Sequence, residues 1–289
     1  MKLATFSDAS GTRLGLVAGN EVVDLAAAAP ELPQDMLAFL EAGNDAMAKA
    51  RRALGDGPRI ALSGVKLEAP IARPPKFLAV GLNYADHVAE SGLETPEHPT
   101  IFNKQSTCIT GPGDPVHVPK VSKVLDYEGE LGVVIGKRGR HVSLDDAPDY
   151  IAGYTIVDDV TVRDWQFRTP TWTLGKSFDT HGPIGPWIVT SDELRDPHML
   201  RLRTFVNDEL RQESNTKELI FDCFKLVEYL SQACTLEPGD IIATGTPSGV
   251  GVLMKPPQLL KQGDVVRIEI EGIGQLENPV VDEPDDTRC

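Results

Sequence analysis

The sequence has few cysteines, a deficit of basic residues and no long apolar run. Its four cysteines, Cys108, Cys223, Cys234 and Cys289, form no C-x-x-C pair, so neither a zinc ribbon nor a dithiol redox motif is indicated. No apolar run approaches the roughly 18–20 residues that a membrane-spanning helix needs. The opening MKLATFSDASG lacks the apolar segment of a signal peptide. We therefore expect a cytoplasmic protein with no membrane partner.

The charge balance limits the classes of partner. The chain has 28 Lys and Arg residues against 43 Asp and Glu residues, which gives a formal net charge of -15. No cluster of Lys and Arg stands out, and this argues against a nucleic-acid partner. A small anionic substrate is still compatible with the composition, because a local site can be cationic within an acidic protein.

Several catalytic and nucleotide-binding motifs are absent. The glycine-rich segment ATGTPSGVGVLMKPP lacks the G-x-x-x-x-G-K-[ST] pattern of a phosphate-binding loop. The chain also lacks the G-x-S-x-G motif of hydrolases and the H-E-x-x-H motif of zinc proteases. The glycine-rich segment instead predicts a tight loop after a strand, where Thr244, Thr246 and backbone N–H groups are available as donors.

Short apolar stretches broken by Gly and Pro dominate the chain and predict a mainly β protein with few helices, of the α+β class. Residues 1–30 predict a small antiparallel meander, and residues 33–54 predict a helix. A stretch rich in Gly and Pro near residues 66–75 predicts a boundary. We expect a small N-terminal cap domain at residues 1–66 and a main domain at residues 67–289.

The segment VLDYEGELGVVIGK, residues 124–137, reads as a buried strand that carries two acids. Glu128 and Glu130 are two residues apart, so in a strand they lie on the same face and repel each other. Asp158 and Asp159 end a second predicted strand. A divalent cation would offset the repulsion, and carboxylate oxygens suit Mg²⁺, Mn²⁺ or Ca²⁺. The alternative is a half-exposed strand whose two glutamates face solvent.

Two further segments carry candidate catalytic groups. In NYADHVAE, His87 and Glu90 are three residues apart, so on a helix they are neighbours and the carboxylate can orient the imidazole as a general base. An ordinary surface pair is the alternative. Arg163, Gln166 and Lys176 fall in one short window after the acids, where such donors can hold a carboxylate or an oxyanion. The alternative there is a long polar loop.

Five segments in order resemble the fumarylacetoacetate hydrolase family, in its acylpyruvase-like and 2-hydroxyhepta-2,4-diene-1,7-dioate isomerase-like branch. They are GLNYADHVAE, DYEGELGVVIGK, AGYTIVDDVTVRDWQ, WTLGKSFDTHGPIGPW and GDIIATGTPSGVG, and they cover about residues 75–272. The resemblance implies a mixed β-sandwich roll with a small N-terminal cap domain, assembled as a homodimer. It also implies a fumarylacetoacetate hydrolase-like catalytic domain at residues 67–289.

The resemblance also implies roles for individual residues. Glu128, Glu130 and Asp159 match the metal ligands, with Mg²⁺ or Mn²⁺ as the cofactor, whereas Asp158 is expected to point away from the metal. The remaining matches are His87 and Glu90 as the water-activating pair, Lys176 as a further catalytic residue, and Arg163, Gln166 and Thr244 as contacts to the substrate.

The function implied is a metal-dependent hydrolase that cleaves a C–C bond in a 2,4-dioxo acid through a metal-bound pyruvate enolate. Two alternatives use the same site: decarboxylation of an oxaloacetate-like 2-oxo dioic acid, and isomerisation of a 2-hydroxy-dienoic acid. A more distant alternative is a non-catalytic β-roll that binds a metabolite. The residues alone do not separate these reactions, because function depends on the site and not on the fold.

Overall fold

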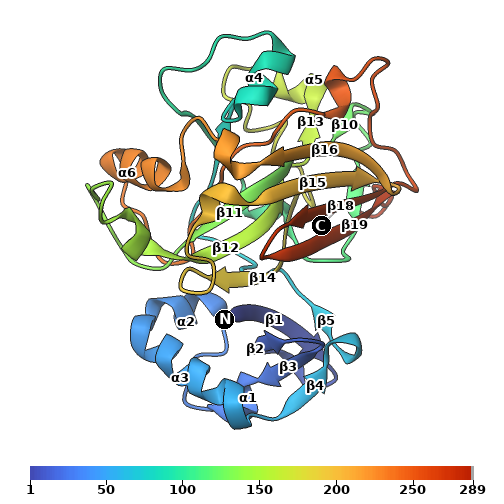
Figure 1. Cartoon of the computed structure of the whole chain (residues 1–289). Coiled ribbons are helices and arrows are strands. Elements are labelled where there is room, and N and C mark those ends of the chain that lie inside the picture. The colour runs from blue at the N-terminus through green and yellow to red at the C-terminus, as the bar shows by residue number, and fades with distance from the viewer. Residues whose placement is uncertain (288–289) are drawn as a thin grey trace.

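The computed structural model describes residues 1–287 and is built around one large mixed sheet (Figure 1). The strands follow the order β4-β3-β2-β1-β14-β12-β11-β17-β6-β7, with β5 paired to β1 and β8 paired to β14. A second sheet has the order β16-β15-β18-β19-β9. The predicted fold class, mainly β with few helices, is confirmed. No helix within the described residues has the length and apolar character that crossing a membrane requires.

Residues 2–24 form the predicted antiparallel meander, and two short strands at residues 59–67 extend it. Its strands are β1 (Lys2–Asp8), β2 (Gly11–Ala18), β3 (Glu21–Asp24), β4 (Arg59–Ala61) and β5 (Lys66–Leu67). Its helices are α1 (Leu25–Ala28), α2 (Met36–Glu41) and α3 (Gly43–Asp56). The single helix predicted over residues 33–54 is therefore divided in two. The break falls at Gly43, whose φ of 65° lies in the left-handed region that glycine tolerates best.

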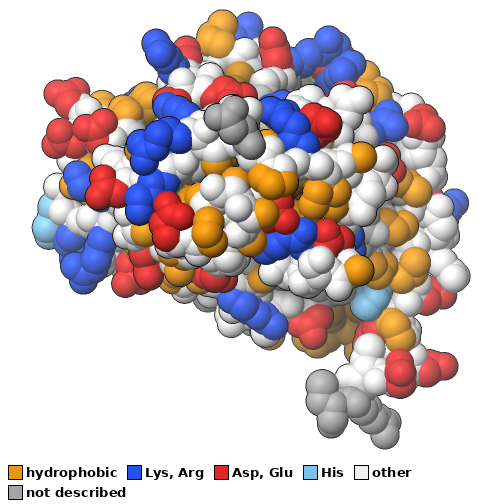
Figure 2. Space-filling model, turned by 90° about the horizontal axis from the view of Figure 1, so that it is seen from below, with side chains coloured by type: hydrophobic (Ala, Val, Ile, Leu, Met, Phe, Trp, Pro, Cys, Tyr) orange, Lys and Arg blue, Asp and Glu red, His pale blue; other side chains and the backbone are white. Residues whose placement is uncertain are grey.

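The N-terminal meander continues into the main sheet, because β1 also pairs with β14 (Gly182–Thr190), where Leu3 lies opposite Ile188. In Figure 1 the meander and its helices lie together below the rest of the molecule. The predicted boundary at residue 66 falls inside β5, so the division into a cap and a main domain stays a prediction. Figure 2, which views this end of the molecule, shows acidic and basic side chains interspersed across it.

The remaining elements build the main body. Its large-sheet strands, besides β14, are β6 (Phe77–Gly81), β7 (Thr100–Lys104), β8 (Ile109–Thr110), β11 (Gly129–Ile135), β12 (Ile151–Asp158) and β17 (Ile241–Ala243). The second sheet contains β9 (Val116–Val118), β15 (Arg201–Val206), β16 (Glu209–Asn215), β18 (Val265–Ile270) and β19 (Gly274–Asp282). A short ladder joins β10 (Leu125–Asp126) to β13 (Thr161–Val162), and the helices are α4 (Ala85–Ser91), α5 (Arg163–Gln166) and α6 (Cys223–Ala233).

Strand β11 is buried along its whole length and divides the core. Its residues Leu131 and Val133 pack with residues of the second sheet and α6. Val134, on the opposite face, packs with Leu3 and residues of β14. Because side chains alternate along a strand, the face that carries Val134 also carries Glu130. Strand β11 thus places the Glu130 carboxylate in a buried position, on the face that packs against Leu3 and β14.

Candidate active site

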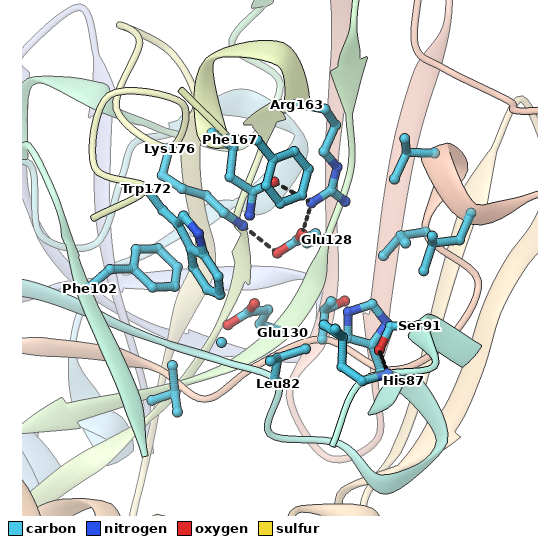
Figure 3. A pocket seen from close by; sticks show the side chains of 18 residues that line it. Leu82, His87, Ser91, Phe102, Glu128, Glu130, Arg163, Phe167, Trp172 and Lys176 are labelled. Atoms are coloured by element: carbon cyan, nitrogen blue, oxygen red, sulfur yellow. Dashed lines mark hydrogen bonds and ion pairs between the residues drawn. The ribbon is translucent and has the colours of Figure 1, made fainter. Parts of the chain in front are cut away.

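A cavity of about 330 Å³ opens at the end of β11, and six of the nine predicted site residues line it (Figure 3). Nine of its 18 lining residues are polar, charged or glycine, and the other nine are apolar. The chemically active lining residues are His87, Glu128, Glu130, Arg163, Gln166 and Lys176. They come from α4, the segment around β11, α5 and the loop that follows α5. Four separate stretches of sequence therefore converge on one cavity.

Three buried carboxylates cluster beside the cavity. Glu128, Glu130 and Asp159 each bring one oxygen to within 4.8 Å of the others. The register of β11 and β12 explains this, since Gly129 lies opposite Asp158 and the Asp159 N–H donates to the Glu128 carbonyl at 2.9 Å. Glu128 is 5% exposed and Glu130 is 1% exposed. The alternative in which both glutamates face solvent is therefore excluded.

Buried cations contact two of these carboxylates. The Lys176 Nζ donates to Glu128 Oε2 at 2.6 Å and to Asp159 Oδ2 at 2.7 Å. The Arg163 Nη1 donates to Glu128 Oε1 at 2.6 Å. Burial would raise the pKa of Glu128, but Lys176 and Arg163 outweigh it and hold that pKa at about 2. Glu128 is therefore ionised at neutral pH.

Glu130 is the member of the cluster whose charge is not balanced. Within residues 1–287 it makes no ion pair, and its Oε2 accepts one hydrogen bond from the Gly245 N–H at 2.8 Å. Burial, and then the charges of Asp159 and Glu128, raise its pKa well above the usual range. Gly245 can approach this closely because it adopts a φ of 104° and a Cβ there would lie 2.8 Å from the Asn83 Cβ.

The residues present fit a divalent cation. Four buried carboxylates meet three buried cations here: Asp126, Glu128, Glu130 and Asp159 against Lys104, Arg163 and Lys176. One negative charge is left over, and it falls on Glu130, which makes no ion pair within the described residues and lines the cavity. Hard oxygen donors in a cluster of this size suit Mg²⁺ or Mn²⁺. The site is therefore a candidate divalent-metal centre.

Two buried residues of this network were not singled out from the sequence. Lys104 on β7 is 2% exposed and donates to Asp159 Oδ1 at 2.6 Å and to the Lys176 carbonyl. Asp126 on β10 accepts from the Arg163 Nε at 2.9 Å and from the backbone N–H of Gly251 at 2.8 Å. The sequence offered no distinct signal for Lys104, because the strand TIFNK also carries the polar residues Thr100 and Asn103. For Asp126 the available signal was its position two residues before Glu128, which in an extended chain places both side chains on one face.

His87 and Glu90 lie three residues apart near the mouth of the cavity. The His87 Nδ1 is 3.5 Å from Glu90 Oε2 and has no hydrogen-bond partner within the described residues. The Glu90 carboxylate also accepts from the Gly249 N–H at 3.0 Å, which ties α4 to the glycine-rich loop. Only His87 of the pair lines the cavity. Hydrogen bonds of catalytic groups are often long in ligand-free structures.

Arg163 and Gln166 face the cavity from one side of α5. The Arg163 Nη1 donates to Gln166 Oε1 at 3.1 Å, so the amide NH₂ group is the end of Gln166 left to contact a ligand. The backbone N–H of Lys176 donates to the Trp172 carbonyl at 3.2 Å, and Figure 3 shows Trp172 and Phe102 beside this lysine.

Thr244 and Asp158 point away from the cavity. The Thr244 hydroxyl donates to the Leu131 carbonyl at 2.9 Å and Thr244 does not line the cavity, whereas Thr246 does. Its role as a substrate contact stays a prediction that this geometry does not support. Asp158 accepts from the Glu128 N–H at 3.0 Å, and burial raises its pKa to about 7. As expected, the acid in the carboxylate cluster is Asp159 and not Asp158.

Comparison with protein families gives one clear match. The model described as the fumarylacetoacetate (FAA) hydrolase C-terminal family matches residues 76–281. Among solved structures, a fumarylacetoacetate hydrolase from Exiguobacterium antarcticum is 37% identical with a TM-score of 0.89, and covers 98% of this chain and 100% of its own. A maleylpyruvate hydrolase from Sphingobium sp. SYK-6, in complex with manganese(II) and pyruvate, is 34% identical with a TM-score of 0.83 and the same coverage.

Curated relatives are more similar still in sequence. An oxaloacetate tautomerase of Xenopus laevis is 45% identical over 97% of this chain and 90% of its own length. A second, from Rattus norvegicus, is 48% identical over 91% of this chain and 85% of its own. Both relatives carry the description mitochondrial. This comparison contradicts the predicted cytoplasmic residence. The lack of a signal-peptide pattern was weak evidence, because it does not separate the cytoplasm from other compartments.

Proposed function

Because the chain belongs to the fumarylacetoacetate hydrolase family, we propose that it is a metal-dependent enzyme that interconverts the keto and enol forms of oxaloacetate or a close 2-oxo acid analogue. Family membership confirms the predicted resemblance and the prediction of an enzyme, so the non-catalytic β-roll is set aside. The observation that carries the proposal is the buried carboxylate cluster that opens onto a cavity beside Lys176. Relatives named oxaloacetate tautomerase support this substrate.

Glu128, Glu130 and Asp159 would hold Mg²⁺ or Mn²⁺. The cation would supply Lewis-acid stabilisation of negative charge on the 2-oxo oxygen of the substrate. Two findings support this assignment: the unbalanced charge on Glu130 and the manganese(II) described for the Sphingobium relative.

The chain's own residues would move the proton. His87 lines the cavity and would take a proton from C3 of the keto acid, while Glu90 stabilises the imidazolium that results. Lys176 would donate a hydrogen bond to the 2-oxo oxygen as that oxygen gains charge. Arg163 and the free amide NH₂ of Gln166 would hold the substrate carboxylate. The proton returns to the oxygen to give the enol, so no other reactant is needed.

Hydrolysis of a 2,4-dioxo acid is a second candidate, and the His87–Glu90 pair is the observation that favours it. In this reaction His87 would take a proton from water, and the hydroxide would attack the carbonyl carbon at C4. The C3–C4 bond would then break, which releases a carboxylic acid and, after C3 is protonated, pyruvate. The maleylpyruvate hydrolase from Sphingobium supports this candidate. Decarboxylation of oxaloacetate would use the same cavity but requires no attacking water.

One assay separates these reactions. Purified protein supplied with Mg²⁺ or Mn²⁺ is given the enol form of oxaloacetate, oxaloacetate at keto–enol equilibrium, and acetylpyruvate. We expect fast metal-dependent decay of the enol signal, with pyruvate release reporting decarboxylation from oxaloacetate and hydrolysis from acetylpyruvate. No metal-dependent acceleration with any of the three would overturn the proposed function.

The assembly and the domain division are further proposals from the family resemblance. We propose a homodimer in which residues 1–66 form a cap domain and residues 67–289 form the catalytic domain. Light scattering of the purified protein should give twice the mass of the 31.3 kDa chain. A monomer at micromolar concentration would contradict the dimer.

A further inference from the structure

The wall of the cavity outside the charged cluster is apolar. It includes Phe102 and Trp172 beside Lys176, and Val250 and Leu253 from the loop that Glu90 contacts. The indole ring of Trp172 lies against the backbone of Gly81. Any larger residue at position 81 would clash with it, because a Cβ there would lie 2.3 Å from the ring. The cavity volume of about 330 Å³ lies within the range of pockets that bind small organic ligands.

Two exposed apolar side chains form the rim of this wall. Phe167, directly after α5, is 70% exposed, and Leu93, two residues after α4, is 57% exposed, yet both line the cavity. Single exposed apolar residues are common on protein surfaces. Here, however, two of them border the same cavity and continue its apolar wall outward. A ligand that reaches the rim would remove both from water.

The cations of the cavity belong to the charged cluster at its reacting end. Within residues 1–287, Arg163 and Lys176 are the only Lys or Arg side chains that line it. Arg163 is paired with Asp126 and Glu128, and Lys176 is paired with Glu128 and Asp159. A carboxylate placed on the apolar wall would lose its hydration without gaining a free counter-charge, which is costly. A hydrocarbon group in the same place would gain from burial.

We propose that this apolar wall binds a hydrocarbon tail, so that the enzyme accepts 2-oxo acids longer than oxaloacetate whose far end is uncharged. The inference rests on the proposed function for the reacting end of the substrate, which the carboxylate cluster, Arg163 and Gln166 would hold. Phe167 and Leu93 are then the specificity-determining residues. Each methylene of the ligand tail that the wall buries should lower the Kd by about fourfold.

The test is direct binding, measured by calorimetry on the full chain loaded with Mn²⁺. The probes are pyruvate, 2-oxohexanoate, 2-oxooctanoate and the dicarboxylate 2-oxoglutarate. We expect 2-oxohexanoate to bind roughly 10- to 60-fold more tightly than pyruvate, since it adds three carbons. We also expect it to bind more tightly than 2-oxoglutarate. An equal Kd for all three monocarboxylates, or tighter binding of 2-oxoglutarate, would overturn the proposal.

Matched variants locate the effect. Phe167→Ser and Leu93→Ser should each reduce the gain in affinity with chain length, and both positions are exposed enough to leave folding intact. Leu174→Ser is the control, because Leu174 is 59% exposed in the same loop but does not line the cavity. An equal loss in the control would overturn the assignment. Oxaloacetate turnover is measured on the same samples to separate this inference from the proposed function. Turnover without an effect of tail length on affinity would overturn this inference alone. An effect of tail length on affinity without turnover would overturn only the proposed reaction.

Discussion

The Lys176 ammonium lies between Glu128 and Asp159, at 2.6 Å from an oxygen of the first and 2.7 Å from an oxygen of the second. One cation thus contacts two of the three carboxylates that would bind the metal. It is 2% exposed, so its charge acts in a medium of low dielectric constant. This position suits a group that stabilises a developing oxyanion, and it also makes the lysine a competitor of the metal.

Replacing Lys176 by Met should separate these two effects. Removal of the oxyanion donor should lower kcat for oxaloacetate tautomerisation by about 10²–10³-fold. Binding of Mn²⁺, measured by calorimetry, should stay as tight or become tighter, because a competing positive charge is gone. A variant with the kcat of the unmodified enzyme would contradict the catalytic role. A variant that loses Mn²⁺ binding would show that the lysine instead organises the carboxylates.

Replacing Glu130 by Gln should stabilise the metal-free protein. Glu130 is a buried carboxylate without an ion pair in the described chain, and such a group costs about 1–3 kcal/mol or more. The free energy of unfolding in urea should therefore rise by about that amount without metal, while added Mn²⁺ should no longer raise it. The exposed Glu97→Gln serves as the control and should change neither quantity. A metal-free Glu130→Gln protein that is less stable would contradict the charge imbalance.

Replacing His87 by Ala should slow both reactions in which His87 would take a proton, the tautomerisation of oxaloacetate and the hydrolysis of acetylpyruvate. Loss of a general base typically lowers the rate by about 10²–10⁴-fold, so acetylpyruvate hydrolysis should fall by that factor. Decarboxylation of oxaloacetate by the same preparation needs no water activation and should fall much less. Glu90→Gln keeps an acceptor for the Gly249 N–H and should give an intermediate loss. Equal losses in hydrolysis and decarboxylation would argue against water activation by His87.

The buried His181 should make stability depend on pH. Its Nε2 is 2.7 Å from the His117 carbonyl, and burial lowers its pKa to about 3, so the folded protein holds it neutral. The unfolded chain takes up a proton below about pH 6.5, so stability falls as the pH drops from there toward 3. This contributes a loss of about 2 kcal/mol between pH 6.5 and pH 5.

The variant His181→Phe tests this by urea unfolding at several pH values. It should be less stable at pH 7, because the bond to His117 is lost, but its stability should fall less between pH 6.5 and pH 5. The exposed His98→Ala should keep the pH dependence of the unmodified protein. Parallel curves for His181→Phe and the unmodified protein would contradict the prediction.

Local patterns predicted the parts of the site that depend on short spacings. The two-residue interval of Glu128 and Glu130 places them on one face of a strand, and the three-residue interval of His87 and Glu90 places them side by side on α4. The choice of Asp159 over Asp158 follows from the same alternation, combined with the family motif. These relations need only the geometry of one element.

Other parts of the site depend on pairings between distant segments, which spacing does not reveal. Lys104 reaches Asp159 across 55 positions of sequence because β7 and the end of β12 meet at the same cavity. The side-chain direction of Thr244 depends on the pairing of β17 with β11, which turns its hydroxyl to the Leu131 carbonyl.

The central claim is that Glu128, Glu130 and Asp159 bind the catalytic metal. Crystals grown with Mn²⁺ and oxalate, measured at the manganese absorption edge, test it most directly. The account predicts one anomalous peak among the three carboxylates, at about 2.0–2.3 Å from an oxygen of each, with oxalate completing the coordination. No peak at this position, or a peak at another site with the cluster empty in an active enzyme, would contradict it.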